Sequence, residues 1–340
     1  MRRVLMLVNP VFSARRRRSI PAIRALLEAS GIQVQLEDTG IDGATARLAR
    51  RAAEAYDAAE TSSIASQSND PGQSSAVAQA TGRIDAIFVC GGDGTVFDVL
   101  QGAAGSSIPI GILPFGTGNV LVQNLNLPRS PLAAARALLD ATPIPVPLGS
   151  IQHGSQSWYF AMSAGTGGHA AMMRAAYRYH KHRTGRLAYF AAGFEILATH
   201  PLQTFGLSLT TVTGETRTRQ ASELIALRVP QLNLWRTGGS LTRPVLRVAS
   251  VAGASRLRLA RAAFDSLALA SGERGHSDPA TAAAIYEDAV SLTITPAPGS
   301  PPLPLQADGE IITTITAAQP VTIAITDTHV TLLANRTRLP

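Results

Sequence analysis

The most constraining feature of the chain is a glycine-rich turn between two apolar segments. Residues 84–90 form a short, mostly apolar run, Gly-Gly-Asp-Gly-Thr follows at 91–95, and an apolar-periodic segment continues over 96–102. This order predicts a buried strand, a tight loop and the start of a helix. Glycines allow close approach of the backbone, and the free N–H groups of a helix start favour anions. The pattern therefore predicts a phosphate-binding site.

Asp93 is the unusual residue of this turn, because a carboxylate repels a neighbouring phosphate. A bound Mg²⁺ would remove this conflict, either directly or through water. The stretch therefore indicates a nucleotide-triphosphate site with magnesium. Its spacing differs from both the Walker loop and the dinucleotide-binding fingerprint.

The composition indicates a folded protein that meets anionic ligands. The 340 residues allow one large or two medium domains, 45% of them are hydrophobic, and the net charge is +7. A basic balance suits phosphates or anionic membrane surfaces, whereas no basic-aromatic pattern typical of nucleic-acid binding is present. The single cysteine, Cys90, excludes an internal disulfide framework and is expected in the core. Without a secretory signal or an apolar run of membrane-spanning length, the expected location is cytoplasmic, with peripheral membrane contact.

Strands and helices alternate over the first 145 residues. Strands are expected at 4–8, 32–36, 84–90 and 108–113, and helices at 15–30, 43–59 and 131–139. Residues 61–75 are rich in Ser, Gln, Asn and Gly, so they are expected to form a flexible loop inserted into the domain. For the arginines at 15–18, a solvated helix end and a phosphate contact both stay open.

A second glycine loop follows the strand at 108–113. It reads Pro114-Phe115-Gly116-Thr117-Gly118-Asn119-Val120. Loops at the carboxyl ends of parallel strands lie on one edge of the sheet, where such folds bind ligands. The two glycine loops are therefore expected to serve one nucleotide site.

From Pro143 the pattern changes to alternating segments separated by turn residues. It predicts a mainly antiparallel second domain that is interrupted by helices at about 168–180 and 185–200. Its expected strands are 146–152, 157–163, 203–212, 223–229, 256–260, 291–295, 321–325 and 330–333. Near the end, Asp308-Gly309-Glu310 is either an ordinary turn or the source of a general base.

Together these residues resemble the diacylglycerol kinase catalytic-domain family, which includes soluble bacterial lipid kinases and is related to sphingoid-base kinases. The resemblance rests on segments in the family's order: Asn9-Pro10, Thr39, 91–95, 114–119, 165–170, 184–189 and 308–310. Gly-Gly-Asp-Gly-Thr alone is shared with NAD kinases and, more loosely, with phosphofructokinases. The Gly-Thr-Gly-Asn loop and the late Asp-Gly-Glu make the resemblance specific to lipid kinases.

The resemblance implies an α/β fold class with two domains. Residues 1–145 would be an NAD kinase-like nucleotide-binding domain, and residues 146–340 a β-sandwich-like lipid-binding domain, with the option that its last strands pack back on the first domain. The implied activity is transfer of the γ-phosphoryl group of ATP to a hydroxyl of a diacylglycerol-like or long-chain-base-like lipid, as in phospholipid biosynthesis. ATP and Mg²⁺ are the implied cofactors. The implied partners are ATP and a lipid at the membrane surface, not nucleic acid, and a homodimer is left open.

The resemblance also implies roles for individual residues. Glu310 would accept the proton of the lipid hydroxyl, and Asp93 would take part in catalysis and bind the metal. This suits phosphoryl transfer, which needs positioning and charge neutralisation more than covalent help. The implied ATP contacts are Thr39, Gly91, Gly92, Asp93, Gly94, Thr95, Val96, Phe97, Gly116, Thr117 and Asn119.

Three departures from the family pattern keep alternatives open. Phe97-Asp98 stands where the family usually has Asn-Glu, and Val120 stands where bacterial diacylglycerol kinases usually have Asp. Residues 244–259 contain no acidic residue, although the family often carries an Asp-Gly pair there, so a second, structural Mg²⁺ site is expected to be absent. One alternative is a catalytically silent lipid- or nucleotide-binding protein. The other, an NAD kinase-like small-molecule kinase, does not explain Asp308-Gly309-Glu310.

Overall fold

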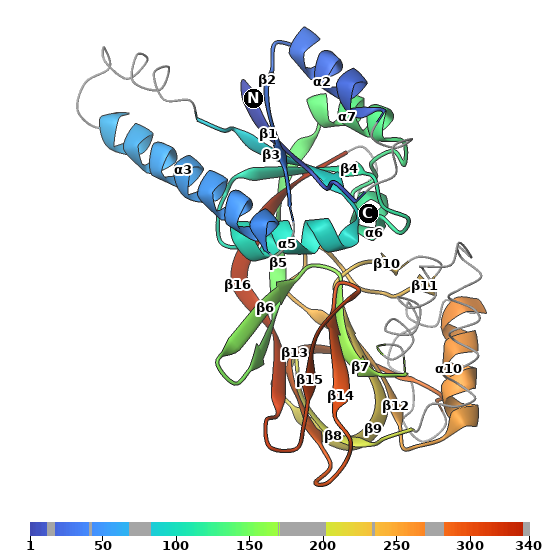
Figure 1. The fold of residues 1–340 in the computed structure, drawn as a ribbon. Coiled ribbons are helices and arrows are strands. Elements are labelled where there is room, and N and C mark those ends of the chain that lie inside the picture. Colours follow the sequence, from blue (N-terminus) through green and yellow to red (C-terminus); the bar gives the residue numbers. More distant parts are fainter. Residues whose placement is uncertain are drawn as a thin grey trace. The chain divides into compact units, whose positions relative to one another are not determined.

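The computed structural model describes residues 1–11, 18–40, 43–67, 83–168, 170, 202–232, 235–268 and 282–335. The chain divides into two compact units. The first unit is Met1–Val146 with Thr328–Pro340, and the second unit is Pro147–Asp327. Figure 1 shows the helices and strands of both units. Among the described residues, no helix combines the length and the apolar character needed to cross a bilayer.

The first unit is built on a parallel sheet. Its strands pair in the order β4-β3-β1-β2, and all three pairings are parallel. The end of β16 also pairs in parallel with β4. Because β2 and β3 lie on opposite sides of β1, the connection changes direction there, and α/β folds bind ligands at such a point. The strands are β1 (Arg3–Val8), β2 (Gln33–Asp38), β3 (Ala86–Gly91), β4 (Pro109–Pro114) and β16 (Val321–Ala334).

Five described helices accompany this sheet: α2 (Ile20–Ala29), α3 (Ala44–Gln67), α5 (Asp93–Ala103), α6 (Val120–Asn124) and α7 (Pro131–Leu139). The middle strand β3 is buried along its whole length, as expected for a parallel strand that is covered on both faces. Helices α3 and α5 approach closely at Gly102, where an added Cβ would collide with the backbone carbonyl of Ala46.

Helix α3 is longer than the sequence predicts. It runs to Gln67, so the prediction of a loop from residue 61 is wrong for 61–67. The hydroxyl groups of Thr61 and Ser62 donate to the carbonyls of Asp57 and Ala58, both at 2.9 Å. Polar side chains that bond back to the helix in this way do not end it. The remainder of the predicted loop, 68–75, lies outside the described residues.

The second unit is built on antiparallel strands, as predicted. Its main sheet runs β15-β14-β7-β9-β12-β13-β16, and β7–β9, β9–β12, β12–β13 and β13–β16 are antiparallel pairs. The strands not yet bounded are β5 (Thr142–His153), β6 (Gln156–Phe160), β7 (Ser163–Gly167), β8 (Phe205–Thr211), β9 (Thr216–Leu227), β12 (Leu246–Ala252), β13 (Ile285–Pro296), β14 (Leu303–Ala307) and β15 (Glu310–Ile315). A short hairpin, β10 (Gln231–Leu232) and β11 (Trp235–Arg236), and helix α10 (Arg256–Ala268) complete the described elements.

Helix α10 corrects the predicted strand at 256–260. The Arg-Leu-Arg-Leu alternation imitates the period of a strand, but Ser255 starts a helix there. The carbonyl of Ser255 accepts from the N–H of Leu259 at 3.0 Å, and its hydroxyl accepts from the N–H of Arg258 at 3.3 Å. A hydroxyl that satisfies a free N–H group is a strong helix start.

Other boundaries also differ. The predicted strand 157–163 is split into β6 and β7, and the two predicted final strands are one strand, β16. The elements that the sequence did not predict are helix α6 and the strands β10, β11, β12, β14 and β15. The predicted helices at 168–180 and 185–200, apart from Gly168 and Ala170, and residues 15–17 of the first predicted helix lie outside the described residues.

A buried carboxylate joins two strands of the second unit. Glu287 of β13 accepts hydrogen bonds from Arg217, at 2.8 Å, and from Arg219, both on β9. Burial alone would raise the pKa of Glu287, but the two guanidinium groups outweigh it and hold the pKa below its ordinary value of 4.5. The ionised form of Glu287 therefore stabilises the fold above that value, and this contribution is lost as the pH falls through the lowered pKa.

We expect Glu287→Gln to lower the free energy of unfolding by about 2 kcal/mol at neutral pH, because a charged acceptor of two hydrogen bonds is lost. The difference from the unsubstituted protein should shrink as the pH falls below 4.5. Denaturant unfolding at several pH values measures both effects. The control is Glu215→Gln, which removes an exposed partner of Arg217. A difference that is constant with pH would contradict the assignment.

Candidate active site

The carboxyl edge of the parallel sheet collects the polar residues that follow its strands. Asn9 follows β1, and its side-chain amide donates to the hydroxyl of Thr95 at 2.9 Å. Thr39 follows β2; its side chain is buried and its N–H donates to the carbonyl of Val8 at 2.9 Å. The glycine loops follow β3 and β4. Every residue of the first unit that the sequence links to ATP therefore lies at or next to this edge, or in the first turns of α5.

The two glycine loops touch through their backbones. The carbonyl of Gly91 accepts from the N–H of Phe115 at 3.0 Å. An added Cβ on Gly116 would stand 2.5 Å from the Cα of Gly92, and one on Gly92 would stand 3.1 Å from the Cα of Gly116. Any side chain at Gly116 would therefore push the loops apart. These glycines are needed for the loop–loop contact, whatever they also do for a ligand.

Helix α5 begins in the first loop with its N–H groups available. Gly92 is extended, with φ −98° and ψ −173°, and no side chain caps the helix within the described part of the chain. The first N–H groups of a helix have no partner inside it, and the helix dipole favours an anion at this end. The start of α5 therefore offers what a phosphate group requires.

Asp93 belongs to the first loop, and its carboxylate reaches the end of the second loop. Its Oδ1 accepts from the N–H of Val120, the first residue of α6, at 2.9 Å. Burial raises the pKa of the Asp93 carboxyl, while N–H groups of Val120, Asn119 and Leu121 oppose the rise. Asp93, the first residue of α5, thus anchors the start of α6.

The same carboxylate fits a limited role with Mg²⁺. Magnesium is commonly held by one or two carboxylates together with waters and substrate phosphates, and Asp93 is the first residue of α5, whose start has no side-chain cap. Within the described residues there is no cluster of three or more His, Cys, Asp or Glu side chains that could hold a metal ion by themselves.

Asn119 shapes the second loop. Its backbone is left-handed, with φ 49°, and its side chain bonds twice to Gly116: Oδ1 accepts from the N–H at 3.1 Å, and Nδ2 donates to the carbonyl at 2.8 Å. Both polar ends of the side chain are thus used within the loop. Thr117, at the tip, is exposed and free to face a ligand.

The side chains after Thr95 belong to the core. Val96 and Phe97 are buried in α5, so only their backbone is available at the loop. Cys90 is also buried, as the sequence predicts, and burial raises the pKa of its thiol. Phe97, one of the departures from the family pattern, therefore changes the core more than the loop.

In the second unit, Asp308 forms the turn between β14 and β15. It is buried with φ 49°, and its carboxylate accepts the N–H groups of Ala161, Met162 and Ser163 at 2.8, 2.7 and 2.9 Å. This carboxylate replaces the strand pairing that residues 161–162 lack, which explains why the predicted strand breaks there. Glu310, the other acid of the segment, is the first residue of β15 and is partly exposed.

Arg228 is a buried cation at the same corner. It follows β9, its N–H donates to the carbonyl of Met162 at 2.8 Å, and its guanidinium group is enclosed by backbone carbonyls. Burial lowers the pKa of Arg228 to about 10, and the charge of Asp308 opposes this. Its carbonyl acceptors are those of Pro147, Leu241, Arg243 and Val245. The sequence analysis missed Arg228; the signal was one arginine inside the apolar run 224–229.

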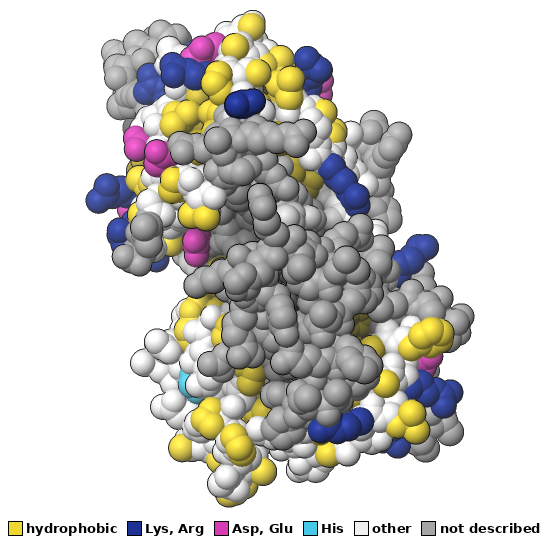
Figure 2. Space-filling view, turned by 45° about the vertical axis from the view of Figure 1, so that its right-hand side comes forward, with side chains coloured by type: hydrophobic (Ala, Val, Ile, Leu, Met, Phe, Trp, Pro, Cys, Tyr) yellow, Lys and Arg dark blue, Asp and Glu magenta, His cyan; other side chains and the backbone are white. Residues whose placement is uncertain are grey.

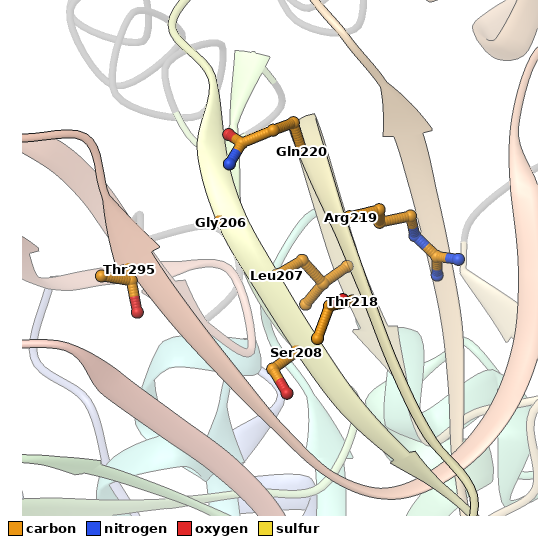
Figure 3. A pocket seen from close by; sticks show the side chains of 7 residues that line it. All are labelled: Gly206, Leu207, Ser208, Thr218, Arg219, Gln220 and Thr295. Carbon is orange, nitrogen blue, oxygen red and sulfur yellow. The ribbon is translucent and has the colours of Figure 1, made fainter.

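A shallow depression of about 320 Å³ lies elsewhere on the second unit. It is lined by residues of β8 and β9 and by Thr295 of β13. Figure 3 shows Arg219 and Gln220 extending to opposite sides of β9, as successive residues of a strand do. None of the residues that the sequence links to catalysis lines this depression.

We expect Asp308→Asn to lower the free energy of unfolding of the second unit by about 2 kcal/mol. The amide would turn a donor toward an N–H group that now donates to the carboxylate. Denaturant unfolding checks this, with Asp327→Asn as the control because Asp327 is exposed. Equal stability of the two variants would show that the three N–H contacts do not hold the corner.

The chain is similar in sequence to diacylglycerol kinases. Residues 3–151 match the model of the diacylglycerol kinase catalytic domain. The chain is 37% identical over 125 residues to a diacylglycerol kinase of Mycobacterium tuberculosis, covering 36% of this chain and 38% of the relative. It is 30% identical over 141 residues to a diacylglycerol kinase of Bacillus subtilis, covering 41% of this chain and 45% of the relative. The matches thus span less than half the length of these curated relatives.

The fold as a whole also has a solved counterpart. A putative diacylglycerol kinase from Bacillus anthracis aligns with a TM-score of 0.66 at 18% identity, over 99% of this chain and 98% of the other. At this identity the likeness concerns the fold alone. It confirms the predicted fold class, an α/β part followed by a β-rich part, and the domain match confirms the family resemblance.

Proposed function

Because residues 3–151 match the model of the diacylglycerol kinase catalytic domain, we propose that the chain is an ATP-dependent lipid kinase. It transfers the γ-phosphoryl group of ATP to a hydroxyl of a diacylglycerol-like or long-chain-base-like lipid. One observation carries the proposal: two glycine loops meet at the uncapped start of α5, with Asp93 between them. The proposal takes residues 1–145 as the nucleotide-binding domain and residues 146–340 as the lipid-binding domain.

In this proposal the first unit binds and orients ATP. The N–H groups at the start of α5 donate to phosphate oxygens, and the exposed Thr117 lies on the second loop to contact the nucleotide. Asn9 fixes the Thr95 side chain, and Asn119 fixes the loop around Gly116. Asp93 is the residue that would hold Mg²⁺, which when bound neutralises charge on the phosphate oxygens.

In the second unit, Glu310 is the proposed general base. Its carboxylate accepts the proton of the lipid hydroxyl, and the hydroxyl oxygen forms a bond to the γ-phosphorus. The bond from that phosphorus to the bridging oxygen of ADP breaks. The adjacent Asp308 is committed to three backbone N–H groups, so of the two acids Glu310 is the one assigned to catalysis.

Two variants test these roles. We expect Glu310→Gln to reduce turnover by about 10²–10⁴-fold with ATP binding unchanged, because only the proton acceptor is lost. Asp93→Ala should abolish turnover and weaken magnesium-dependent ATP binding. Phosphate transfer from labelled ATP to mixed micelles, and calorimetric ATP binding, measure the two effects. The lipid panel is diacylglycerol, monoacylglycerol, sphingosine, ceramide and phosphatidylglycerol.

The controls are Glu215→Gln and Asp140→Ala, which change exposed acids that belong to neither glycine loop. Loss of ATP binding in Glu310→Gln would refute its role as the base. ATP binding without any phosphorylated lipid would favour a silent lipid- or nucleotide-binding protein, and phosphorylation of NAD⁺ alone would favour an NAD kinase-like enzyme.

A further inference from the structure

Helix α10 exposes two large apolar side chains on one side. Leu257 is 80% exposed and Phe264 is 66% exposed. They are seven residues apart, so they lie on the same face of the helix, about 10 Å apart along its axis. Large apolar side chains that are exposed together on one face of a helix are typical of an interaction surface.

The opposite face of α10 packs on the second unit. Ala262 is buried in a cluster with Val251 and Ala283, and Leu259 packs against this cluster. At 100° per residue, Leu259 and Ala262 point away from Leu257 and Phe264. The helix is thus held by one face, and the exposed apolar side chains are not needed to attach it.

Basic side chains surround the exposed face. Arg261 lies on the stripe between Leu257 and Phe264, its side chain is 72% exposed, and it has a long ion pair of 3.8 Å with Asp265. Arg256 precedes Leu257 and is exposed, and Arg258 bonds to the carbonyl of Ala252. With three arginines and one aspartate at 256–265, the helix has a net positive charge. Figure 2 shows yellow and dark blue side chains close together over α10, on the right-hand side of the second unit.

We propose that this face of α10 docks on a bilayer that contains anionic lipids. Leu257 and Phe264 insert at the boundary between headgroups and acyl chains, while Arg261 and Arg256 stay at the level of the phosphates. An amphipathic helix with apolar side chains on one side and arginines beside them binds a membrane surface in this way. The net charge of +7 on the chain complements the same surface. The inference rests on the proposed function, because a lipid substrate requires the enzyme to reach a bilayer.

Vesicle co-sedimentation of the full chain without ATP tests the docking independently of turnover. The vesicles are phosphatidylcholine alone, or phosphatidylcholine with phosphatidylglycerol. We expect binding to the mixed vesicles, at least about tenfold weaker for Leu257→Ser/Phe264→Ser because the two apolar side chains that insert into the bilayer are lost. Arg261→Gln should weaken this binding about fivefold. Added salt should make the difference between this variant and the unsubstituted protein smaller, because salt screens the attraction between Arg261 and the lipid phosphates.

The matched control is Val212→Ser, which changes a side chain that is 55% exposed in the turn after β8. It should bind as the unsubstituted protein does. Equal binding by the double variant and the unsubstituted protein would overturn the proposal. So would a double variant that changes only the oligomeric state, because the face would then join two copies of the chain. Phe264→Ser alone, with thermal unfolding of each variant, separates lost docking from lost folding.

The outcomes also separate this inference from the proposed kinase. Vesicle binding that depends on Leu257 and Phe264 supports the docking even if no lipid is phosphorylated, in which case only the kinase assignment fails. If a short-chain lipid is phosphorylated in solution and vesicle binding is the same with and without the Leu257 and Phe264 side chains, the docking proposal is overturned and the kinase assignment stands.

Discussion

The contact between the backbones of Gly92 and Gly116 is the constraint on which the candidate site of the first unit depends. It requires two residues without side chains at the ends of neighbouring parallel strands. Once the loops touch, Asp93 can reach the start of α6, and Asn119 can bond to the backbone of Gly116. The two loops are therefore held together by their own hydrogen bonds, and among the described residues no side chain caps the start of α5.

The second unit uses buried charges for a different purpose. The carboxylate of Asp308 holds the corner at 161–163 by accepting its N–H groups. The guanidinium group of Arg228 donates to backbone carbonyls such as those of Leu241 and Val245, and only its backbone N–H reaches the corner, at the carbonyl of Met162. In the segment Asp308-Gly309-Glu310, the aspartate is thus structural, and only the glutamate at the start of β15 is proposed to take part in chemistry. The three N–H groups compensate the burial of the Asp308 carboxylate, whereas the same carboxylate without these partners would destabilise the fold.

Local patterns were enough to predict much of the first unit. The apolar run at 84–90, the glycines and the periodic segment after them predict β3, the loop and α5 without knowledge of distant residues. The contact between the glycine loops was also predictable in outline, since carboxyl ends of parallel strands share an edge. The structural roles of Asn9, Asn119 and Arg228 were not, because they depend on partners that only the folded chain brings close.

The errors in the second unit have the same origin. The break between β6 and β7 depends on Asp308, almost 150 positions later in the chain. The start of helix α10 was mistaken for a strand because Arg-Leu-Arg-Leu alternates polar and apolar residues as a strand does. The helix is instead favoured by the cap from Ser255 and by the burial of Ala262. The assignment of Glu310 as a base is still a prediction, as are the nucleotide contacts.

The most direct test is amide hydrogen exchange with and without Mg-ATP. If the two glycine loops form one phosphate site, residues 92–97 and 115–121 should both exchange more slowly, with the same dependence on ATP concentration. Asp93→Ala should lose this protection in both loops. Protection of one loop alone, or of neither while ATP is bound, would contradict the account.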